Sequence, residues 1–233
     1  MTILGIDTTT RSGSIAVIRA GEVLGGLQVA GRLDHSEQVL SSISYLLSRL
    51  DIARNELSAV AVSTGPGSFT GVRVGLACAG GLARALGLPA LGLSSLEALA
   101  RGVSGRVPGS WICPWLEAGR GEVYAAAYLD RGQGRGPRVV REPTLARPEE
   151  WLEGLAAAPA RFLGDGAQAH RDLLVRHRGP ECMEQPEGPW FLAQALALWA
   201  ERRLSTGELS ERPVLEPLYL RVSDAEMQRR KKQ

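Results

Sequence analysis

One segment of this chain combines residue types and spacing that could hold an anion. It lies between a predicted strand and a predicted helix and reads Gly65-Pro66-Gly67-Ser68-Phe69-Thr70-Gly71. Glycines permit positive φ angles and close backbone approach, and a helix N-terminus attracts negative charge. A nucleotide-binding P-loop needs a lysine after its last glycine, whereas Val72 and Arg73 follow here. The alternative is a tight structural turn in which Ser68 or Thr70 caps the helix.

A second candidate for ligand chemistry is the turn after the first predicted strand. Asp7 ends that strand, and the hydroxyl residues Thr8, Thr9, Thr10 and Ser12 follow. This arrangement resembles the first phosphate hairpin of actin-like nucleotide-binding folds. A polar turn without a ligand explains the same residues equally well.

The sequence offers no complete set of residues for catalysis. A serine or cysteine nucleophile needs a base, and no histidine falls in a GxSxG, HExxH or HxxxH arrangement. The three histidines are His35, His170 and His177. The cysteines form no CxxC pair, so we also expect no metal site. Lys231 and Lys232 are the only lysines, which excludes Schiff-base chemistry and a P-loop lysine in the folded body.

The basic charge of the chain is concentrated at its C-terminus. The formal net charge is +2, yet the last thirteen residues carry five basic and two acidic side chains, which leaves the rest slightly negative. A protein that grips nucleic acid on its own usually carries a basic surface on its folded body. The sequence predicts no such grip, and leaves the tail either as a solvated C-terminus or as a contact for RNA through Arg229, Arg230, Lys231 and Lys232.

The sequence also predicts where the protein works. No apolar run approaches the eighteen or so residues that a membrane span needs, and the N-terminus has no basic targeting region. An odd number of widely spaced cysteines suits a reducing compartment. We therefore expect a soluble, cytoplasmic protein without membrane contact.

Hydrophobic periodicity predicts three consecutive strands followed by strands that alternate with helices. The expected strands are 3–7, 14–19, 22–29, 59–64, 90–93, 111–116 and 122–129, and the expected helices are 34–50, 70–86, 95–101, 148–157, 167–178 and 189–204. This order is typical of a ribonuclease H-like lobe with a mixed sheet. We expect an α/β protein with an N-terminal lobe at 1–104, a reduced C-terminal lobe at 105–220 and a basic, disordered tail at 221–233.

Two helix faces are candidates for close contact with a partner. Small residues recur every fourth position along the second helix, and short serines line one side of the first. These residues are Gly71, Gly75, Ala79 and Ala83 in the ridge, and Ser41, Ser44 and Ser48 on the serine face. Interior glycines each cost roughly 1 kcal/mol of helix propensity, and a helix–helix interface could compensate for this. Packing on the protein's own sheet explains the ridge as well, and a solvated face explains the serines.

Several of these motifs together resemble the TsaB family, also called YeaZ. The resemblance covers residues 1 to about 130 and rests on Ile3-Leu4-Gly5-Ile6-Asp7-Thr8-Thr9, His35-Ser36-Glu37, the string from Gly65 to Leu76, and Gly81-Leu82-Ala83. It implies an actin-like (ASKHA) fold of two ribonuclease H-like lobes, the second reduced. It also implies membership of the bacterial machinery that installs threonylcarbamoyladenosine in tRNAs decoding codons that begin with A.

Within that machinery the resemblance implies a non-catalytic scaffold subunit, which binds and activates the TsaD transferase through its N-terminal helices. It implies self-association as a homodimer through the same surface, and contact with TsaE and tRNA only through the complex. It assigns no catalytic, metal-binding or cofactor-binding residue, and leaves open weak nucleotide binding or a nucleotide at the interface with TsaD. The alternative is an autonomous enzyme of the actin-like fold, a glycoprotease or a small-molecule kinase.

Residue chemistry at two positions agrees with a non-catalytic role. Aligned by its neighbours, the stretch from Pro89 to Leu99 corresponds to the TsaD segment that carries both metal-binding histidines, and Ser95 and Leu99 stand in their places. A leucine cannot ligate a metal, and one serine hydroxyl is a poor ligand. The chain also departs from its family, because Glu117-Ala118-Gly119-Arg120 replaces the usual Asp-Ala-Arg. Gly164-Asp165-Gly166 is the faint remnant of the glycine-rich loops of a TsaD-like second lobe.

Overall fold

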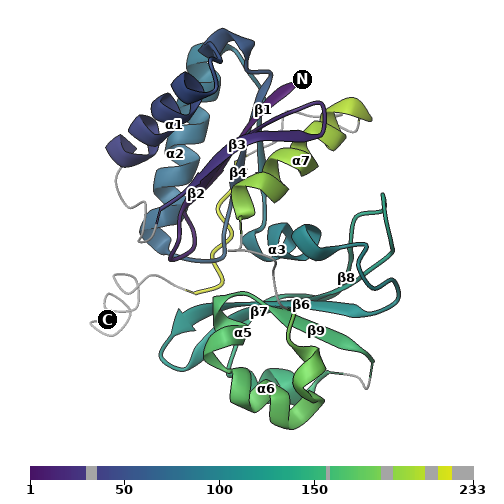
Figure 1. The fold of residues 1–233 in the computed structure, drawn as a ribbon. Coiled ribbons are helices and arrows are strands. Elements are labelled where there is room, and N and C mark those ends of the chain that lie inside the picture. Colours follow the sequence, from purple (N-terminus) through teal and green to yellow (C-terminus); the bar gives the residue numbers. More distant parts are fainter. Residues whose placement is uncertain (30–35, 156–157, 185–190, 208–214, 222–233) are drawn as a thin grey trace, which may run out of the picture.

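A computed structural model describes residues 1–29, 36–155, 158–184, 191–207 and 215–221. Figure 1 shows two lobes, each built on its own sheet. Some predicted features lie outside the described residues. These are the beginnings of the predicted helices at 34 and 189, the residue His35, and the basic tail beyond Arg221. No helix in the described ranges is long and apolar enough to cross a membrane.

Five strands form the first sheet in the order β3-β2-β1-β4-β5. They are β1 (Thr2–Asp7), β2 (Ser14–Arg19), β3 (Glu22–Gln28), β4 (Ala59–Ser63) and β5 (Ala90–Leu93). β1 pairs antiparallel with β2 and parallel with β4, and β4 pairs parallel with β5. The predicted opening meander and the helix-connected strands after it are confirmed, and the order is that of a ribonuclease H-like lobe.

Helices cover both faces of this sheet (Figure 1). α1 (Ser36–Arg49) and α2 (Phe69–Leu86) share one hydrophobic core with Leu4 and Ile6 of β1. α3 (Ser95–Val103) and α7 (Leu192–Ser205) share another with Ile3. Successive strand side chains point to opposite faces, which explains why neighbours on β1 enter different cores. A short 3-10 helix, η1 (Arg54–Glu56), precedes β4.

The position of α7 corrects the predicted division of the chain. The sequence predicts a C-terminal lobe at 105–220, but α7 returns to the first lobe and contacts β1, β2 and β4. Gly5 permits this approach, because a Cβ there would lie 2.0 Å from the Ala193 carbonyl oxygen. After α7, the segment Leu215 to Arg221, which we call the C-terminal strap, runs between the two lobes (Figure 1).

The second lobe has a four-stranded sheet in the order β8-β7-β6-β9. Its elements are β6 (Trp111–Gly119), β7 (Glu122–Leu129), β8 (Arg138–Ala146), α4 (Pro148–Glu153), β9 (Ala160–Leu163), α5 (Asp165–Ala169), α6 (Arg171–Arg178) and the 3-10 helix η2 (Pro180–Cys182). Trp115 is the centre of its core, with Trp151 and Phe162 edge-on to it at 5.4 Å. The expectations for this lobe were incomplete: β8 and β9 were not predicted, and of the two helices expected between 148 and 178 one is shorter and one is divided at His170.

Candidate functional site between the lobes

Asp7 is buried at the carboxyl end of β1, where hydroxyl groups surround its carboxylate. Its Oδ1 accepts hydrogen bonds from the Thr9 backbone N–H (3.0 Å), the Thr9 hydroxyl (2.6 Å) and the Ser63 hydroxyl. Its Oδ2 accepts one from the Thr10 hydroxyl at 2.9 Å. Both carboxylate oxygens are therefore engaged by the chain itself, as the polar-turn interpretation of this segment requires.

Ser95 joins this cluster from the start of α3. Its hydroxyl lies 2.8 Å from the Thr9 hydroxyl. Because the Thr9 hydroxyl donates its proton to Asp7, Ser95 is the donor in this second bond. Leu99, one turn later, is buried in the core with 3% of its surface exposed. Of the described residues, no group of three or more His, Cys, Asp or Glu could hold a metal ion, here or elsewhere.

Asp7→Asn is expected to destabilise the N-terminal lobe. The amide would place an N–H₂ donor among hydroxyl donors, so at least one buried group would lose its partner, at a cost of about 1–3 kcal/mol. The midpoint of chemical unfolding measures this loss. Asp172→Asn, an exposed change on α6, is the matched control, and equal stability of the two variants would contradict the assigned network.

The glycine string lets the start of α2 close directly onto the turn after β1. A Cβ at Gly71 would lie 1.9 Å from the Thr8 carbonyl oxygen, and one at Gly67 would lie 2.3 Å from that of Thr9. The Ser68 N–H donates to the Thr9 carbonyl at 2.8 Å, and the Ser68 hydroxyl accepts from the Gly71 N–H at 3.2 Å. Ser68 is therefore the helix cap, which is the role that the structural-turn alternative gives it.

The small-residue ridge of α2 faces inward, which corrects its predicted role. Gly71, Gly75, Ala79 and Ala83 are all buried, and a Cβ at Gly75 would lie 2.4 Å from the Thr8 hydroxyl. The ridge packs on the lobe's own sheet, the alternative that the sequence left open. These four positions therefore supply no exposed surface to a partner helix.

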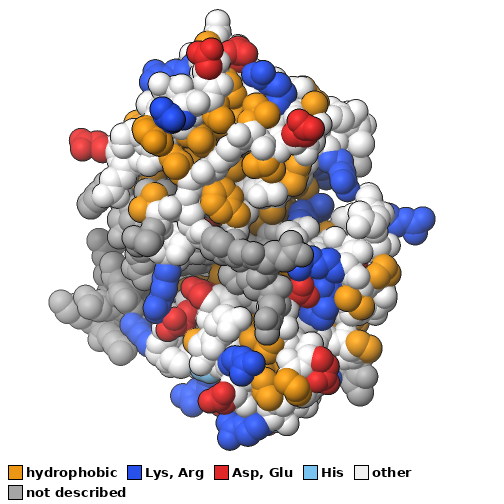
Figure 2. All heavy atoms as spheres, viewed as in Figure 1, with side chains coloured by type: hydrophobic (Ala, Val, Ile, Leu, Met, Phe, Trp, Pro, Cys, Tyr) orange, Lys and Arg blue, Asp and Glu red, His pale blue; other side chains and the backbone are white. Residues whose placement is uncertain are grey.

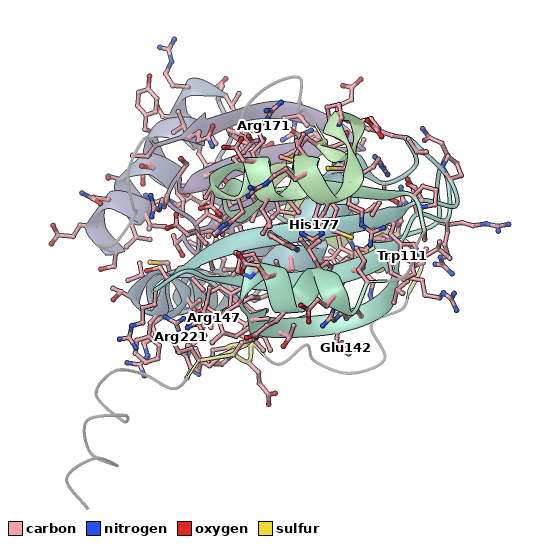
Figure 3. All side chains as sticks on the ribbon, turned by 90° about the horizontal axis from the view of Figure 1, so that it is seen from below. Trp111, Glu142, Arg147, Arg171, His177 and Arg221 are labelled. Atoms are coloured by element: carbon pink, nitrogen blue, oxygen red, sulfur yellow. The ribbon has the colours of Figure 1, made fainter. Side chains whose placement is uncertain are left out.

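A cavity of about 540 Å³ lies between the lobes beside this turn. Its described lining comes from four segments and two single residues: Thr9–Arg11, Pro66–Thr70, Leu116–Gly119, Leu218–Arg221, Tyr124 and Asp165. The C-terminal strap crosses it, because the Leu218 N–H donates to the Thr64 carbonyl at 2.8 Å and Arg221 pairs with Glu122 of the second lobe. Figure 3 labels Arg221 at this position.

The charges that line the cavity compensate one another. Arg11 pairs with Glu117 at 2.7 Å. Glu117 belongs to the motif in which this chain differs from the family, and through this ion pair it contacts the opposite lobe. Arg221 pairs with Glu122 and donates to the Ala118 carbonyl at 2.8 Å. Partial burial raises the pKa of Asp165, although hydrogen bonds from the backbone N–H groups of Glu117 and Gly166 act in the opposite direction. The lining therefore offers little net positive charge to a polyphosphate.

The faint glycine motif of the second lobe serves close packing. A Cβ at Gly164 would lie 2.3 Å from the Trp115 carbonyl oxygen, and one at Gly166 would lie 2.8 Å from the carbonyl carbon of Leu116. These glycines let α5 lie against β6. Asp165 between them accepts a hydrogen bond from the Glu117 N–H at 3.0 Å, which fixes the end of that strand.

The outward face of α1 and α2 carries apolar and small side chains that sequence reasoning missed. Tyr45 and Leu40 of α1 are 58% and 45% exposed. Ala77 and Gly81, one turn apart on α2, are also exposed. The signal was present in the sequence, because these two small residues lie on the side of α2 opposite the ridge. We call these four residues the outer face.

The predicted serines lie on or near the outer face. Ser41 and Ser48 are exposed, and the Ser41 hydroxyl donates to the Gln38 carbonyl at 3.1 Å. Ser44 is half-buried and accepts a hydrogen bond from the Arg54 guanidinium at 3.1 Å. Ser41 and Ser48 are thus accessible to a partner, whereas Ser44 already has a partner within the chain.

Comparison with known proteins gives consistent matches. A family model described as TsaD, tRNA N6-adenosine threonylcarbamoyltransferase, matches residues 29–174. The tRNA threonylcarbamoyladenosine biosynthesis protein TsaB of Bacillus subtilis is 35% identical over 75% of this chain and 75% of its own length. The protein of the same name from Escherichia coli is 30% identical over 95% of both chains.

Solved structures agree with these matches. YeaZ from Pseudomonas aeruginosa is 29% identical and superposes with a TM-score of 0.73 over 94% of this chain and 99% of its own. An activator of the 2-hydroxyisocaproyl-CoA dehydratase from Clostridium difficile is 12% identical, with a TM-score of 0.53 over 92% of this chain and 99% of its own. This second likeness concerns the actin-like fold alone.

Proposed function

Because the chain belongs to the TsaB family of tRNA threonylcarbamoyladenosine biosynthesis proteins, we propose that it is a non-catalytic subunit that binds and activates a TsaD transferase. One observation carries the proposal. The family resemblance aligns Ser95 and Leu99 with the metal-binding histidines of a TsaD; in this structure Ser95 is hydrogen-bonded to Thr9, and Leu99 is buried in the core. Neither residue can take up a metal ligand's role in this arrangement.

The outer face is the proposed docking surface for TsaD. Tyr45 and Leu40 offer exposed apolar area, and aromatic residues are enriched among residues that dominate binding energy. Ala77 and Gly81 allow a partner helix to approach α2 closely. The same surface could pair two copies of this chain, so we propose that homodimer formation and TsaD binding compete.

A nucleotide is not expected to bind tightly to this chain alone. Both arginines that line the interlobe cavity are paired with glutamates, and Asp165 adds a further carboxyl group. The hydroxyl groups of Thr9 and Thr10 are already committed to Asp7. We propose that any nucleotide requirement of the assembly is met at the interface with TsaD, and that TsaE and tRNA join through that complex in the cytoplasm.

The alternative of an autonomous glycoprotease or small-molecule kinase gains no support from the described histidines. His177 is exposed on α6 (Figure 3), and the ring of His170 packs edge-on to Trp115 with centroids 6.4 Å apart. Neither ring is hydrogen-bonded to a nucleophile among the contacts of the described residues. A general base needs such a contact with the proton that it removes.

The proposal predicts a defined complex with TsaD. We expect size-exclusion chromatography with light scattering to show a heteromer of this chain and the TsaD of its own organism, and the homodimer fraction to fall as TsaD is added. The assembled proteins with TsaE, ATP and an activated threonylcarbamoyl donor should restore threonylcarbamoyladenosine in a tRNA transcript, and omission of this chain should abolish it. No association under any of these conditions would refute the scaffold role.

A further inference from the structure

A second cavity, of about 480 Å³, opens on the side of the molecule away from α1 and α2. It lies where α3, the β7–β8 loop and α7 meet. Its described lining is Arg101–Ser104, Arg106, 132–137, Phe191, Gln194, Ala195, Leu198, Trp199 and Arg202. We call this cavity the basic groove.

Arginine dominates the charge of the basic groove. Arg101, Arg106, Arg135 and Arg202 line it, and no aspartate or glutamate is among its described lining residues. Arg101 and Arg106 are partly neutralised by Glu97 and Glu184, at 2.6 Å and 2.8 Å, but Arg135 and Arg202 are exposed. Figure 2 shows basic side chains gathered on this side of the molecule. Because the chain outside its last thirteen residues has a slightly negative net charge, the composition did not indicate this local concentration of arginine.

Hydrogen bonds hold the groove in shape. The buried carboxylate of Asp130 accepts from the backbone N–H groups of Gly105 (2.8 Å), Val107 (3.3 Å) and Gly132 (3.0 Å), which joins the loop before β6 to the loop after β7. The Arg202 guanidinium of α7 donates to the Gly134 carbonyl at 3.1 Å. The arginines are therefore presented from three anchored segments, and little ordering of the walls would be needed on binding.

We propose that the basic groove binds the phosphodiester backbone of an RNA. Arginine forks match phosphate oxygens in geometry and charge. The half-buried Trp199 ring in the same lining offers a surface on which an unpaired base can stack. Arg131 and Arg138 are exposed beside the cavity, so the basic surface continues along the β7–β8 loop, which suits several phosphates rather than one small anion.

The position of the groove agrees with a role inside an assembly. The outer face and the groove lie on opposite faces of the first sheet (Figure 1), so a protein partner on α1 and α2 leaves the groove open. The identification of the RNA as a tRNA rests on the proposed function. The proposal that the groove binds an RNA backbone does not depend on that function. The proposal goes beyond that function, because this chain would contact the tRNA directly.

Charge reversal in the full chain tests the proposal. Binding of a fluorescent tRNA transcript is measured by anisotropy between 50 and 200 mM salt, a range chosen because phosphate contacts are salt-dependent. Arg135→Glu with Arg202→Glu is expected to weaken binding by tenfold or more. Because two phosphate contacts are lost, the slope of log K against log salt should also fall in magnitude by about two. Arg135→Glu alone, which keeps the Arg202 contact to the loop, should give a smaller change of the same kind.

Arg171→Glu with Arg176→Glu is the matched control, because both residues are exposed on α6 and the net charge changes equally (Figure 3 labels Arg171). All variants keep the same C-terminal sequence, so its basic residues contribute equally. Wild-type affinity and salt slope in the groove variant, an equal loss in the control, or full displacement of the tRNA by millimolar inorganic phosphate would each overturn the proposal. Failure of the proposed function would appear instead as absent TsaD binding with tRNA affinity retained.

Discussion

Ala79→Trp is expected to destabilise the N-terminal lobe strongly. Ala79 has no exposed surface and packs in the core that α1 and α2 share with β1 and β4. An indole in that space would force the helix off the sheet. Overpacking of this size costs about 3 kcal/mol or more. Thermal unfolding monitored by circular dichroism should show a large fall in the midpoint, and a variant with wild-type stability would mean that α2 is turned differently.

Ala77→Trp, two residues earlier on the same helix, is the matched control with the opposite expectation. Ala77 is exposed on the outer face, so the indole would project into solvent and leave the unfolding midpoint close to that of the wild type. The same indole would block close approach of a partner helix. We expect loss of TsaD binding and of the homodimer in chromatography; a folded Ala77→Trp that binds TsaD normally would refute the outer face as the docking surface.

The two variants separate the interpretations that the sequence left open for α2. A four-residue recurrence of glycine and alanine predicts close approach by something, but it does not say whether that is a sheet or a helix. The deciding contact is between Gly71 and the Thr8 carbonyl, which are far apart in the sequence. Long-range contacts of this kind are invisible to helical periodicity alone.

The first sheet was predictable because its strands follow local rules. β1, β2 and β4 are buried and rich in β-branched residues, and short turns separate β1, β2 and β3. α7 was predicted as a helix but placed in the wrong lobe, because its partner Gly5 precedes it by nearly the whole chain. Element type is a local property, whereas the face against which a helix packs is not.

β8 was missed because its residues are unusual for a strand. It contains Arg138, Arg141, Glu142 and Pro143 and lies at the edge of the second sheet. Proline is tolerated in an edge strand, where one row of N–H groups has no strand to pair with. The basic groove was missed because its arginines, which lie between positions 101 and 202, come together only after α7 has folded back onto the first lobe.

The sequence identified individual residues of the candidate site but not the contacts between them. Asp7 and Ser68 have the polar-turn and capping roles that the sequence predicts for them, whereas the contact of Ser95 with Thr9 was not predicted. The arrangement of Asp7, Ser63 and Ser95 in one buried cluster depends on β1, β4 and α3 meeting at the same edge of the sheet. Fold topology supplies that information, because the carboxyl ends of parallel strands share an edge.

The buried ion pair of the second lobe gives the other large expected effect. The Arg161 guanidinium bonds Asp130 at 2.8 Å and Glu184 at 2.6 Å, with side-chain exposures of 10%, 0% and 9% for the three residues. Arg161→Met would leave two buried carboxylates without their common partner. Breaking such a pair costs about 3–5 kcal/mol. The free energy of unfolding in urea should fall by this amount.

Arg19→Met is the matched control, because Arg19 pairs with Glu56 at 3.1 Å where both side chains are more than 40% exposed. Exposed pairs contribute about 0–1 kcal/mol, so this variant should be nearly as stable as the wild type. Equal losses in the two arginine variants would show that Arg161 acts through packing of its alkyl chain and not through its charge.

The pH dependence of stability adds an independent test of Asp130. Burial would raise its pKa, but backbone N–H groups of Gly132, Gly105 and Val107 and the Arg161 guanidinium together hold the pKa below its ordinary value. The unfolded state then binds the proton more readily, so the stabilisation is complete above about pH 4 and is lost as the pH falls through the folded-state pKa.

Asp130→Asn should therefore be less stable than the wild type at neutral pH, and the difference should shrink in acid. The same carboxylate anchors the loops that form the basic groove. Asp130→Asn should consequently weaken tRNA binding at pH 7 without altering any arginine. A variant that loses stability but binds tRNA normally would show that the groove keeps its shape without Asp130, and would locate the RNA contact in the arginines alone.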